Sequence, residues 1–408
     1  MSTATLMRLA VAVLSFSSLS WALTLTVAQP NTNCPIAGYT TIEAAVNAAN
    51  PGDTVEVCPA LYPEQVLITK PLTLNGLTAN GVGRVLIQPA TMSPVTGVPA
   101  EAVITVMNTT GVHIQNLAID ASNNGVSGCA TGVAGIHFYN ASGDVESSAI
   151  SGALVSSPQT CPSSAQLASK SGLGVLVDSS EAGPFRVNIA HNSIHDYTRN
   201  GILANGAGIT VLVDDNTISG VGPAIGIYQF GVFLENGTVG AVTNNFITEG
   251  LCGALDHTDC DNLRSEGVTL RAPGNGTIVQ GNFISQAQSG IFINGGDQVI
   301  VRNNVIRNIQ GMDGIDIQGS AAGEFIRSII QGNTIANVTP VSLNGCGIWE
   351  SPGTGVSGNL IENTIVNDAY CGVEAVEADH VANGIYSNTL YPLLDSDSAN
   401  NAPPATEP

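Results

Sequence analysis

Apolar and polar residues alternate in short stretches along the chain, and two phrases recur out of phase with each other. The first phrase is Asn, any residue, then Ile or Leu, and it begins at Asn192, Asn216, Asn245, Asn282, Asn304, Asn333, Asn363 and Asn388. The second is Gly, apolar, any residue, apolar, and it begins at Gly135, Gly231, Gly267, Gly290 and Gly314, with shorter copies at Gly347 and Gly372. Such alternation predicts short strands that each turn one apolar face inward.

Successive copies of the Asn phrase are 22 to 37 residues apart, which is typical of stacked repeating units. One unit cannot bury its apolar face alone, but stacked coils bury it together. Asn tolerates left-handed turns, and stacked Asn side chains can hydrogen-bond from rung to rung. We therefore expect an all-β solenoid of about ten coils, which lets a 408-residue chain avoid a core larger than the usual limit of ~250–300 residues.

Composition narrows the possible functions. Only 11% of the residues are charged, Lys occurs twice, and the formal net charge is −21. A chain this acidic is not held on nucleic acid by phosphate contacts. Its 43% hydrophobic content argues against disorder.

The N-terminus has the pattern of a secretion signal. Arg8 precedes the apolar run Leu9 to Leu19, and Ser20-Trp21-Ala22 ends in a small residue suited to cleavage. We expect residues 1–22 to be removed, with an uncleaved anchor as the alternative. No later segment reaches ~18 uninterrupted apolar residues, so we expect no membrane span and a secreted, periplasmic or cell-surface protein.

The stretches Thr41–Val46, Asn50–Val55, Tyr62–Val66 and Ile68–Leu74 resemble the start of secreted proteins of the right-handed parallel β-helix superfamily, which includes pectin lyase-like enzymes. The resemblance covers roughly residues 35–390. It implies a short capping helix near 41–49, within a cap and first coils spanning 35–75. We place the β-helix domain at 23–390 and a disordered tail at 391–408.

Catalytic motifs of that superfamily are mostly absent. Tyr62 and Glu64 resemble the Tyr-x-Glu segment of pectin methylesterases, but their later motif has no match. Asp214-Asp215 resembles the paired Asp of pectinase-type hydrolases without the accompanying segments, and an ordinary turn is the favoured interpretation. Asp256-His257-Thr258-Asp259 faintly resembles a motif of alginate epimerases.

Eight cysteines in an exported chain indicate disulfides, although the number alone allows 105 pairings. Cys346 and Cys371 each precede the Gly of consecutive copies, so we pair them across neighbouring rungs. Cys129 and Cys161 both lie before consecutive rungs and are paired for that reason. We further expect bridges Cys252–Cys260 and Cys34–Cys58.

Outward positions follow from the second phrase, because its third residue and the residue two later both point away from the core. Among these positions we predict substrate-binding roles for His137, Tyr139, Asp178, Asn205, Phe233, Phe292, Asn294, Trp349 and Glu374. Aromatic rings stack on sugars while carboxylates and amides bind hydroxyls, so the face predicts a polysaccharide groove. The alternative is an ordinary solvated surface.

Candidate catalytic and metal-binding residues cluster near residues 249–266. There Asp256 and His257 should lie level with Glu235 and Arg271, and we predict catalytic roles for these four and for Asp316. The alternative, which is the favoured interpretation of the loop itself, is an acidic solvated loop closed by a disulfide. The resemblance implies Arg271 as a base for β-elimination, whereas hydrolysis would use Glu235 with Asp316 or Asp256. If a metal is needed, Ca²⁺ suits Asp256, Asp259 and Asp261.

Three functions remain open. The first is a polysaccharide lyase, epimerase or hydrolase, and the second is a non-catalytic β-helix for glycan binding, adhesion or surface structure. The third, metal handling in the periplasm, is disfavoured by scarce Met and six His. Because an acidic groove repels polyuronates unless a cation bridges them, neutral glycans are at least as suitable. We expect the chain to act as a monomer on a polysaccharide or cell-surface glycan.

Overall fold

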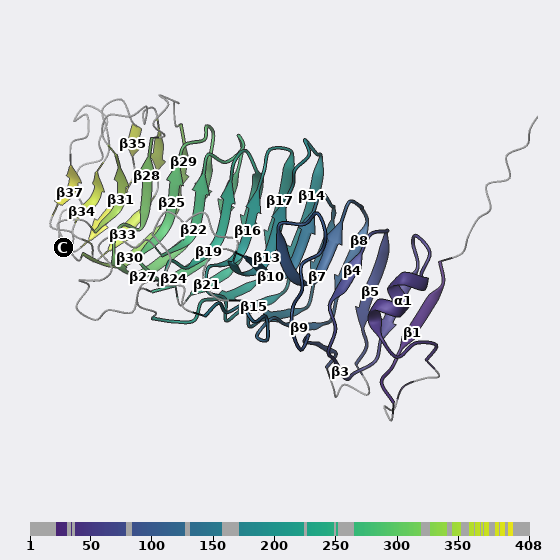
Figure 1. The fold of residues 1–408 in the computed structure, drawn as a ribbon. Helices are drawn as coiled ribbons and strands as arrows, with labels where there is room; N and C mark the ends of the chain where they lie inside the picture. The colour runs from purple at the N-terminus through teal and green to yellow at the C-terminus, as the bar shows by residue number, and fades with distance from the viewer. Residues whose placement is uncertain are drawn as a thin grey trace, which may run out of the picture.

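The structure is a computed structural model that describes residues 22–30, 34, 37–78, 84–126, 131–156, 171–223, 227–248, 250–251, 265–319, 327–340, 345–351, 359–362, 364–367, 369, 371–374, 380–382, 384–387 and 391–394. In these residues the chain is built of strands with a single helix, α1 (Ile42–Ala48). The strands form three parallel sheets, here called A, B and C, which run along an elongated rod (Figure 1).

Sheet A contains β1 (Thr24–Val27), β2 (Thr54–Val57), β5 (Leu72–Gly76), β8 (Val112–Gln115), β11 (Gly143–Glu146), β14 (Phe185–Ala190), β17 (Ile209–Asp214), β20 (Val239–Thr243), β23 (Ile278–Gln280), β26 (Ile300–Arg302), β29 (Ile329–Gln331), β32 (Leu360–Glu362) and β35 (His380–Ala382). Sheet B contains β3 (Leu61–Tyr62), β6 (Leu86–Ile87), β9 (Ala118–Asp120), β12 (Ala149–Ser151), β15 (Ser193–His195), β18 (Thr217–Ser219), β21 (Phe246–Thr248), β24 (Phe283–Ala287), β27 (Val305–Gly311), β30 (Thr334–Pro340), β33 (Ile365–Asn367) and β36 (Ile385–Ser387). Sheet C contains β4 (Val66–Ile68), β7 (Ala100–Met107), β10 (Gly132–Tyr139), β13 (Ser171–Asp178), β16 (Asn200–Asn205), β19 (Phe230–Glu235), β22 (Glu266–Arg271), β25 (Ser289–Asn294), β28 (Ile315–Gln318), β31 (Cys346–Glu350), β34 (Cys371–Glu374) and β37 (Tyr391–Leu394).

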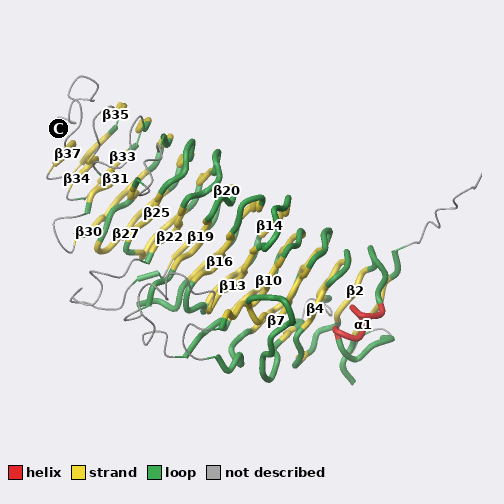
Figure 2. Tube along the Cα trace, turned by 45° about the horizontal axis from the view of Figure 1, so that its top comes forward, coloured by secondary structure: helices red, strands yellow, loops and turns green. Residues whose placement is uncertain are grey.

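The chain visits the sheets in the order A, B, C, and each turn adds one strand to each sheet. Successive turns therefore stack along the rod, from α1 at one end to β37 at the other (Figure 2). This confirms the parallel β-helix that the repeat predicts. Sheets B and C hold 12 strands each, so the rod is slightly longer than the expected ten or so coils.

The apolar members of both phrases fill the axis of the rod. Ile194, Ile218 and Ile247 from the Asn phrase are buried, as are Val232 and Val268 from the Gly phrase. All belong to one continuous core cluster that extends from Val27 to Val373. Burial of this apolar column is the main force that holds the turns together.

The Asn residues form the predicted ladder at the turn between sheets A and B. The Oδ1 of Asn216 accepts from both the backbone N and the Nδ2 of Asn192, at 2.9 and 3.0 Å. The Nδ2 of Asn216 donates back to the carbonyl of Ile189 at 2.8 Å. The same pattern repeats through five links joining Asn192, Asn216, Asn245, Asn282, Asn304 and Asn333.

Helix α1 lies at the N-terminal end of the rod (Figure 1), where Ile42, Ala45 and Val46 are buried as the amphipathic pattern predicts. The carboxylate of Glu64 accepts hydrogen bonds from the backbone N of Ile42 and Glu43, at 2.8 and 2.9 Å. Glu64 therefore anchors the helix to the rod.

Tyr62, the other half of the Tyr-x-Glu motif, is fully buried and donates from its hydroxyl to the Cys58 carbonyl at 2.8 Å. Burial raises the pKa of Tyr62 to about 12. The motif that resembles pectin methylesterases thus has a structural role in this chain.

Two predicted disulfides are present, Cys34–Cys58 and Cys346–Cys371, and the Cα atoms of the second pair lie 4.4 Å apart on neighbouring strands. The other four cysteines lie outside the described residues.

Strand β37 pairs with β34, so sheet C continues into the range predicted as tail. In the described part of the chain, no helix has the length and apolarity to cross a membrane.

Candidate functional site

The strand register of sheet C places the predicted outward residues in two columns. The first column is His137, Leu176, Leu203, Phe233, Thr269, Phe292, Asp316, Trp349 and Glu374. The second column is Tyr139, Asp178, Asn205, Glu235, Arg271, Asn294 and Gln318. The repeat therefore predicts correctly which residues are neighbours, and their role in binding substrate stays a prediction.

The exposure expected for the aromatic residues of the first column is not found. Phe233 and Phe292 are only 3% and 9% exposed, and within this column Trp349 and Glu374 are the half-buried members. Phe233 packs at 5.1 Å from the ring of Phe230, inside an apolar cluster on the outer face of sheet C. This outer cluster comprises Ala100, Ala102, Ala134, Leu173, Leu176, Leu203, Tyr228, Phe230 and Phe233.

Sequence reasoning missed a third outward column, formed by the residue before each glycine of sheet C. Leu173 and Leu176 both belong to the outer cluster, although strict alternation would place them on opposite faces. The strand changes phase at Gly174, where an added Cβ would lie 2.5 Å from the Gly201 carbonyl oxygen. A glycine inside a strand often marks such an irregularity, and this was the available signal.

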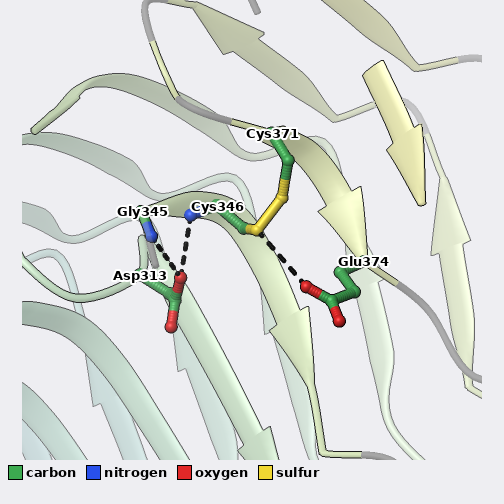
Figure 3. Close-up of a disulfide and its surroundings, with 5 residues drawn as sticks. All are labelled: Asp313, Gly345, Cys346, Cys371 and Glu374. Atoms are coloured by element: carbon green, nitrogen blue, oxygen red, sulfur yellow. Dashed lines mark hydrogen bonds between the residues drawn. A yellow bond between two sulfur atoms is a disulfide. The ribbon is translucent and has the colours of Figure 1, made fainter. Parts of the chain in front are cut away.

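The third column carries two buried carboxylates, Glu266 and Asp313. Glu266 accepts a hydrogen bond from the hydroxyl of Thr269. Asp313 accepts from the backbone N of Gly345 and Cys346, at 3.2 and 2.8 Å (Figure 3). Both carboxylates are therefore engaged in holding local structure.

Glu235 and Arg271 meet at the centre of the second column, where they are register partners and form an ion pair. The Arg271 guanidinium also lies over the Phe233 ring, 5.0 Å from its centroid. The role of Arg271 as a base, which the resemblance implies, stays a prediction. A guanidinium paired with a carboxylate remains a cation that donates hydrogen bonds, so it suits binding and charge stabilisation better than proton abstraction.

Asp316 is fully buried and accepts from the Nε2 of Gln318 at 3.1 Å. It lies on β28, three strands from Glu235 on β19. At ~4.8 Å per strand this separation is about 14 Å. Glycosidase carboxylate pairs lie about 5–9.5 Å apart, so Glu235 and Asp316 are too distant to act as an acid–base pair.

A second pair of ionisable groups joins β10 to β13. His137 Nε2 lies 2.6 Å from Asp178 Oδ1, and both side chains are almost completely buried. Because a carboxylate only accepts, the imidazole donates through Nε2. Its Nδ1 makes no hydrogen bond within the described residues.

Arg199 is a further buried cation beside the outer cluster, and the sequence did not single it out. It is 2% exposed, donates to the Tyr228 carbonyl at 2.9 Å, and lies 5.6 Å from the centroid of the Tyr228 ring. Burial lowers the pKa of Arg199 to about 10. The guanidinium fixes the segment that precedes β19, and with it the cluster around Phe233.

Exposed aromatic rings occur instead on sheet B. Phe246 and Phe283 stack with a centroid distance of 4.9 Å, and Phe246 is 44% exposed. Arg307 lies over the other face of the pair, 4.4 Å from the Phe283 centroid. Phe246 and Phe283 occupy the variable position of the Asn phrase, which could have identified them.

Asp256, His257, Asp259 and Asp261 lie outside the described residues, as do Cys252 and Cys260, so calcium binding by this loop stays a prediction. Within the described residues, one group of three potential ligands has its atoms within 4.8 Å of one another, Cys346, Cys371 and Glu374 (Figure 3). Their two sulfurs form a disulfide, so no thiolate is available to a metal. Glu374 lies 3.9 Å from the Cys346 Sγ.

Three parallel sheets, an axial apolar core and a polar ladder define a single-chain parallel β-helix. A family model for the right-handed β-helix region matches residues 266–392. No curated protein sequence matches the chain.

Solved structures share the fold at low sequence identity. The A-module of mannuronan C-5 epimerase AlgE4 from Azotobacter vinelandii has a TM-score of 0.54 and 12% identity, over 87% of this chain and 94% of that one. A GH136 lacto-N-biosidase from Eubacterium ramulus has a TM-score of 0.55 and 11% identity, over 92% and 67%. The catalytic domain of a GH87 α-1,3-glucanase in complex with nigerose has a TM-score of 0.59 and 12% identity, over 93% and 70%. At this identity the likeness establishes the fold alone, a right-handed parallel β-helix.

Proposed function

We propose that this protein is exported and acts on a polysaccharide that lies along the second column. Five members of that column are half-buried and accessible, namely Tyr139, Asn205, Arg271, Asn294 and Gln318. Each strand contributes a phenol, amide, carboxylate or guanidinium, which are the groups that bind sugar hydroxyls. The fold relatives that act on mannuronan, lacto-N-biose units or α-1,3-glucan support a glycan substrate.

The observation that carries a catalytic role is the placement of two carboxylates, Asp178 and Glu235, on either side of Asn205 in that column. They are two strands apart, which is about 9.6 Å at ~4.8 Å per strand. Inverting glycosidases place their acid and base about 6.5–9.5 Å apart, leaving room for a water molecule. Hydrolysis with inversion is therefore the reaction that this spacing supports best.

Each carboxylate has a partner that fixes its position. His137 donates to Asp178, and Arg271 pairs with Glu235. Glu235 would take a proton from the attacking water, and Asp178, in its protonated form, would give its proton to the leaving oxygen. The net charge of −21 favours a neutral glycan over a polyuronate.

A panel of neutral and anionic polysaccharides, each with and without Ca²⁺, tests this function. We expect new reducing ends from a neutral glycan, and loss of at least about 100-fold in rate for Glu235→Gln and for Asp178→Asn. Asp144→Asn is the matched control, because Asp144 forms a similar His–Asp pair with His113 on sheet A.

Other products would change the assignment. Unsaturated ends would indicate β-elimination, and binding without any product would indicate a non-catalytic glycan-binding protein. Turnover that survives both substitutions would reject the second column as the site.

A further inference from the structure

A separate cavity of about 260 Å³ opens on the outer face of sheet C near its N-terminal end. It lies between α1, strands β4 and β7, and residues 93–95. In Figure 2 β4 lies beside the helical segment, and β7 follows it along the rod. Neither the repeat pattern nor the second column accounts for it.

Two polar side chains hold the walls of this cavity in place. Gln65 donates from Nε2 to the carbonyl of Ala102 at 2.8 Å, and its Oε1 accepts from the backbone N of Ser93 at 2.8 Å. Glu43 on α1 accepts from the backbone N of Leu67 at 2.9 Å and from Asn47 Nδ2 at 3.1 Å. The cavity is therefore preformed, and the hydrogen-bonding capacity of these two residues is largely used.

Thr105 differs from its neighbours in the cavity. It occupies an outward position of β7, in register with His137, and is 1% exposed. Thr105 is one of the residues that line the cavity, and its buried Oγ1 makes no hydrogen bond to any residue that the structure describes. Buried hydroxyls nearly always have a partner, so this one points to a ligand that supplies it.

The remaining lining residues define the chemistry of that ligand. Leu67, Pro94 and Val95 are the accessible apolar residues of the lining, and none of the described residues that line the cavity is cationic. An anion is disfavoured by Glu43 and by the net charge of −21. The volume lies just below the ~300 Å³ typical of the smallest pockets for drug-sized ligands, which suits one ring.

We propose that this cavity binds a single neutral sugar unit, with apolar walls against the C–H face and Thr105 hydrogen-bonded to a ring hydroxyl. Thr105 and Glu235 lie four strands apart, on β7 and β19. That separation is about 19 Å along the rod, whereas Asp178 on β13 is two strands, about 10 Å, from Thr105. The cavity therefore lies beyond the N-terminal end of the pair of carboxylates. It can hold a sugar whether or not the second column is catalytic.

The test is the binding of methyl glycosides of glucose, galactose, mannose and N-acetylglucosamine to the whole protein, followed by saturation-transfer NMR and calorimetry. We expect one of them to bind, and Thr105→Val to weaken it about tenfold, the effect of losing one hydrogen bond. Val95→Trp should fill the cavity and abolish binding. Thr217→Val, on the exposed face of sheet B, should change nothing.

Two further measurements distinguish a loss of sugar binding from misfolding of the variant and from failure of the proposed catalytic function. Thr105→Val removes a hydroxyl without a described partner, so its melting temperature should equal or exceed that of the wild type. Glu235→Gln should bind the sugar normally even if it loses turnover, so failure of either proposal is recognisable. The inference is overturned if none of the four glycosides binds, or if both cavity variants bind as well as the wild type.

Discussion

Two polar columns run along the same rod, and they differ in how much they repeat. The ladder from Asn192 to Asn333 uses one residue type and one hydrogen-bond pattern in every turn. The second column of sheet C presents different side chains from strand to strand, and its contacts change each time. Both columns are set by the same strand register.

This difference separates structure from chemistry. A repeated side chain satisfies a backbone need that recurs in every turn, because each turn leaves the same N–H and C=O groups inside the bend. A varied column meets no such recurring need, so its side chains are free to match a ligand. The comparison predicts that ladder substitutions cost stability, whereas column substitutions cost function.

The largest effect should come from Asn245→Ala in the middle of the ladder. Asn245 is 1% exposed, and its Nδ2 and Oδ1 bind the turns on both sides. The substitution leaves the backbone N of Asn216 without its acceptor, so we expect about 3–5 kcal/mol of destabilisation. Urea unfolding measures it, with Asn188→Ala on the outward face of sheet A as control. A loss below that of the control would contradict the ladder's role.

A smaller loss is expected where the strands of sheet C change phase. An added Cβ on Gly231 would lie 2.6 Å from the Gly267 carbonyl oxygen, so Gly231→Ala should cost about 1–3 kcal/mol. Gly38→Ala is the matched control, because a Cβ there meets nothing within 4 Å. Thermal unfolding of the two variants distinguishes steric crowding from the general effect of replacing glycine. Equal melting temperatures would refute the close approach.

The buried hydrogen bond of Tyr62 does not repeat along the rod. We expect its loss to have an effect smaller than that of the ladder and larger than that of the second column. Tyr62→Phe removes the hydrogen bond to the Cys58 carbonyl and should cost about 1 kcal/mol below pH 10. The unfolded phenol ionises near its ordinary pKa of 10.0, but the folded one holds its proton to a pKa of about 12. The stabilisation is therefore complete below pH 10 and is lost as the pH rises toward 12. Unfolding of wild type and variant across this range should converge, and parallel curves would contradict the assignment.

The smallest effect on stability should come from Glu235→Gln in the second column. The amide keeps the shape and one hydrogen bond to Arg271, whose side chain is 38% exposed, so we expect less than about 1 kcal/mol. If activity falls while thermal unfolding is unchanged, the contrast between the columns holds. A loss of stability comparable to that of Asn245→Ala would contradict the distinction between the ladder and the second column.

The sequence predicts the fold well because each turn repeats the same physical problem. Period-two alternation, the Asn phrase and the paired Cys346 and Cys371 all depend on neighbouring turns, and the register confirms them. It predicts which outward residues are neighbours, including Glu235 with Arg271.

Exposure could not be predicted in the same way. Whether Phe233 faces solvent depends on Phe230 and Tyr228, whose outward position follows from the phase change at the glycine and not from alternation. The pairing of His137 with Asp178 joins different columns of two strands, and the cavity at Thr105 depends on a loop held by Gln65. These are contacts between non-repeating parts, and the repeat carries no information about them.

The Asn ladder also gives the rod a net dipole along its axis. In every link the Nδ2 of one Asn donates to the Oδ1 of the next, so the six side-chain amides are aligned head to tail. Backbone dipoles in a sheet largely cancel, but those of the ladder add, as peptide dipoles of ~3.5 D do in a helix. The amide N–H ends point toward the C-terminal turns, so the ladder's positive pole lies near Asn333 and its negative pole near Asn192. The ladder thus gives this acidic chain a fixed dipole along its axis that does not depend on ionisable side chains.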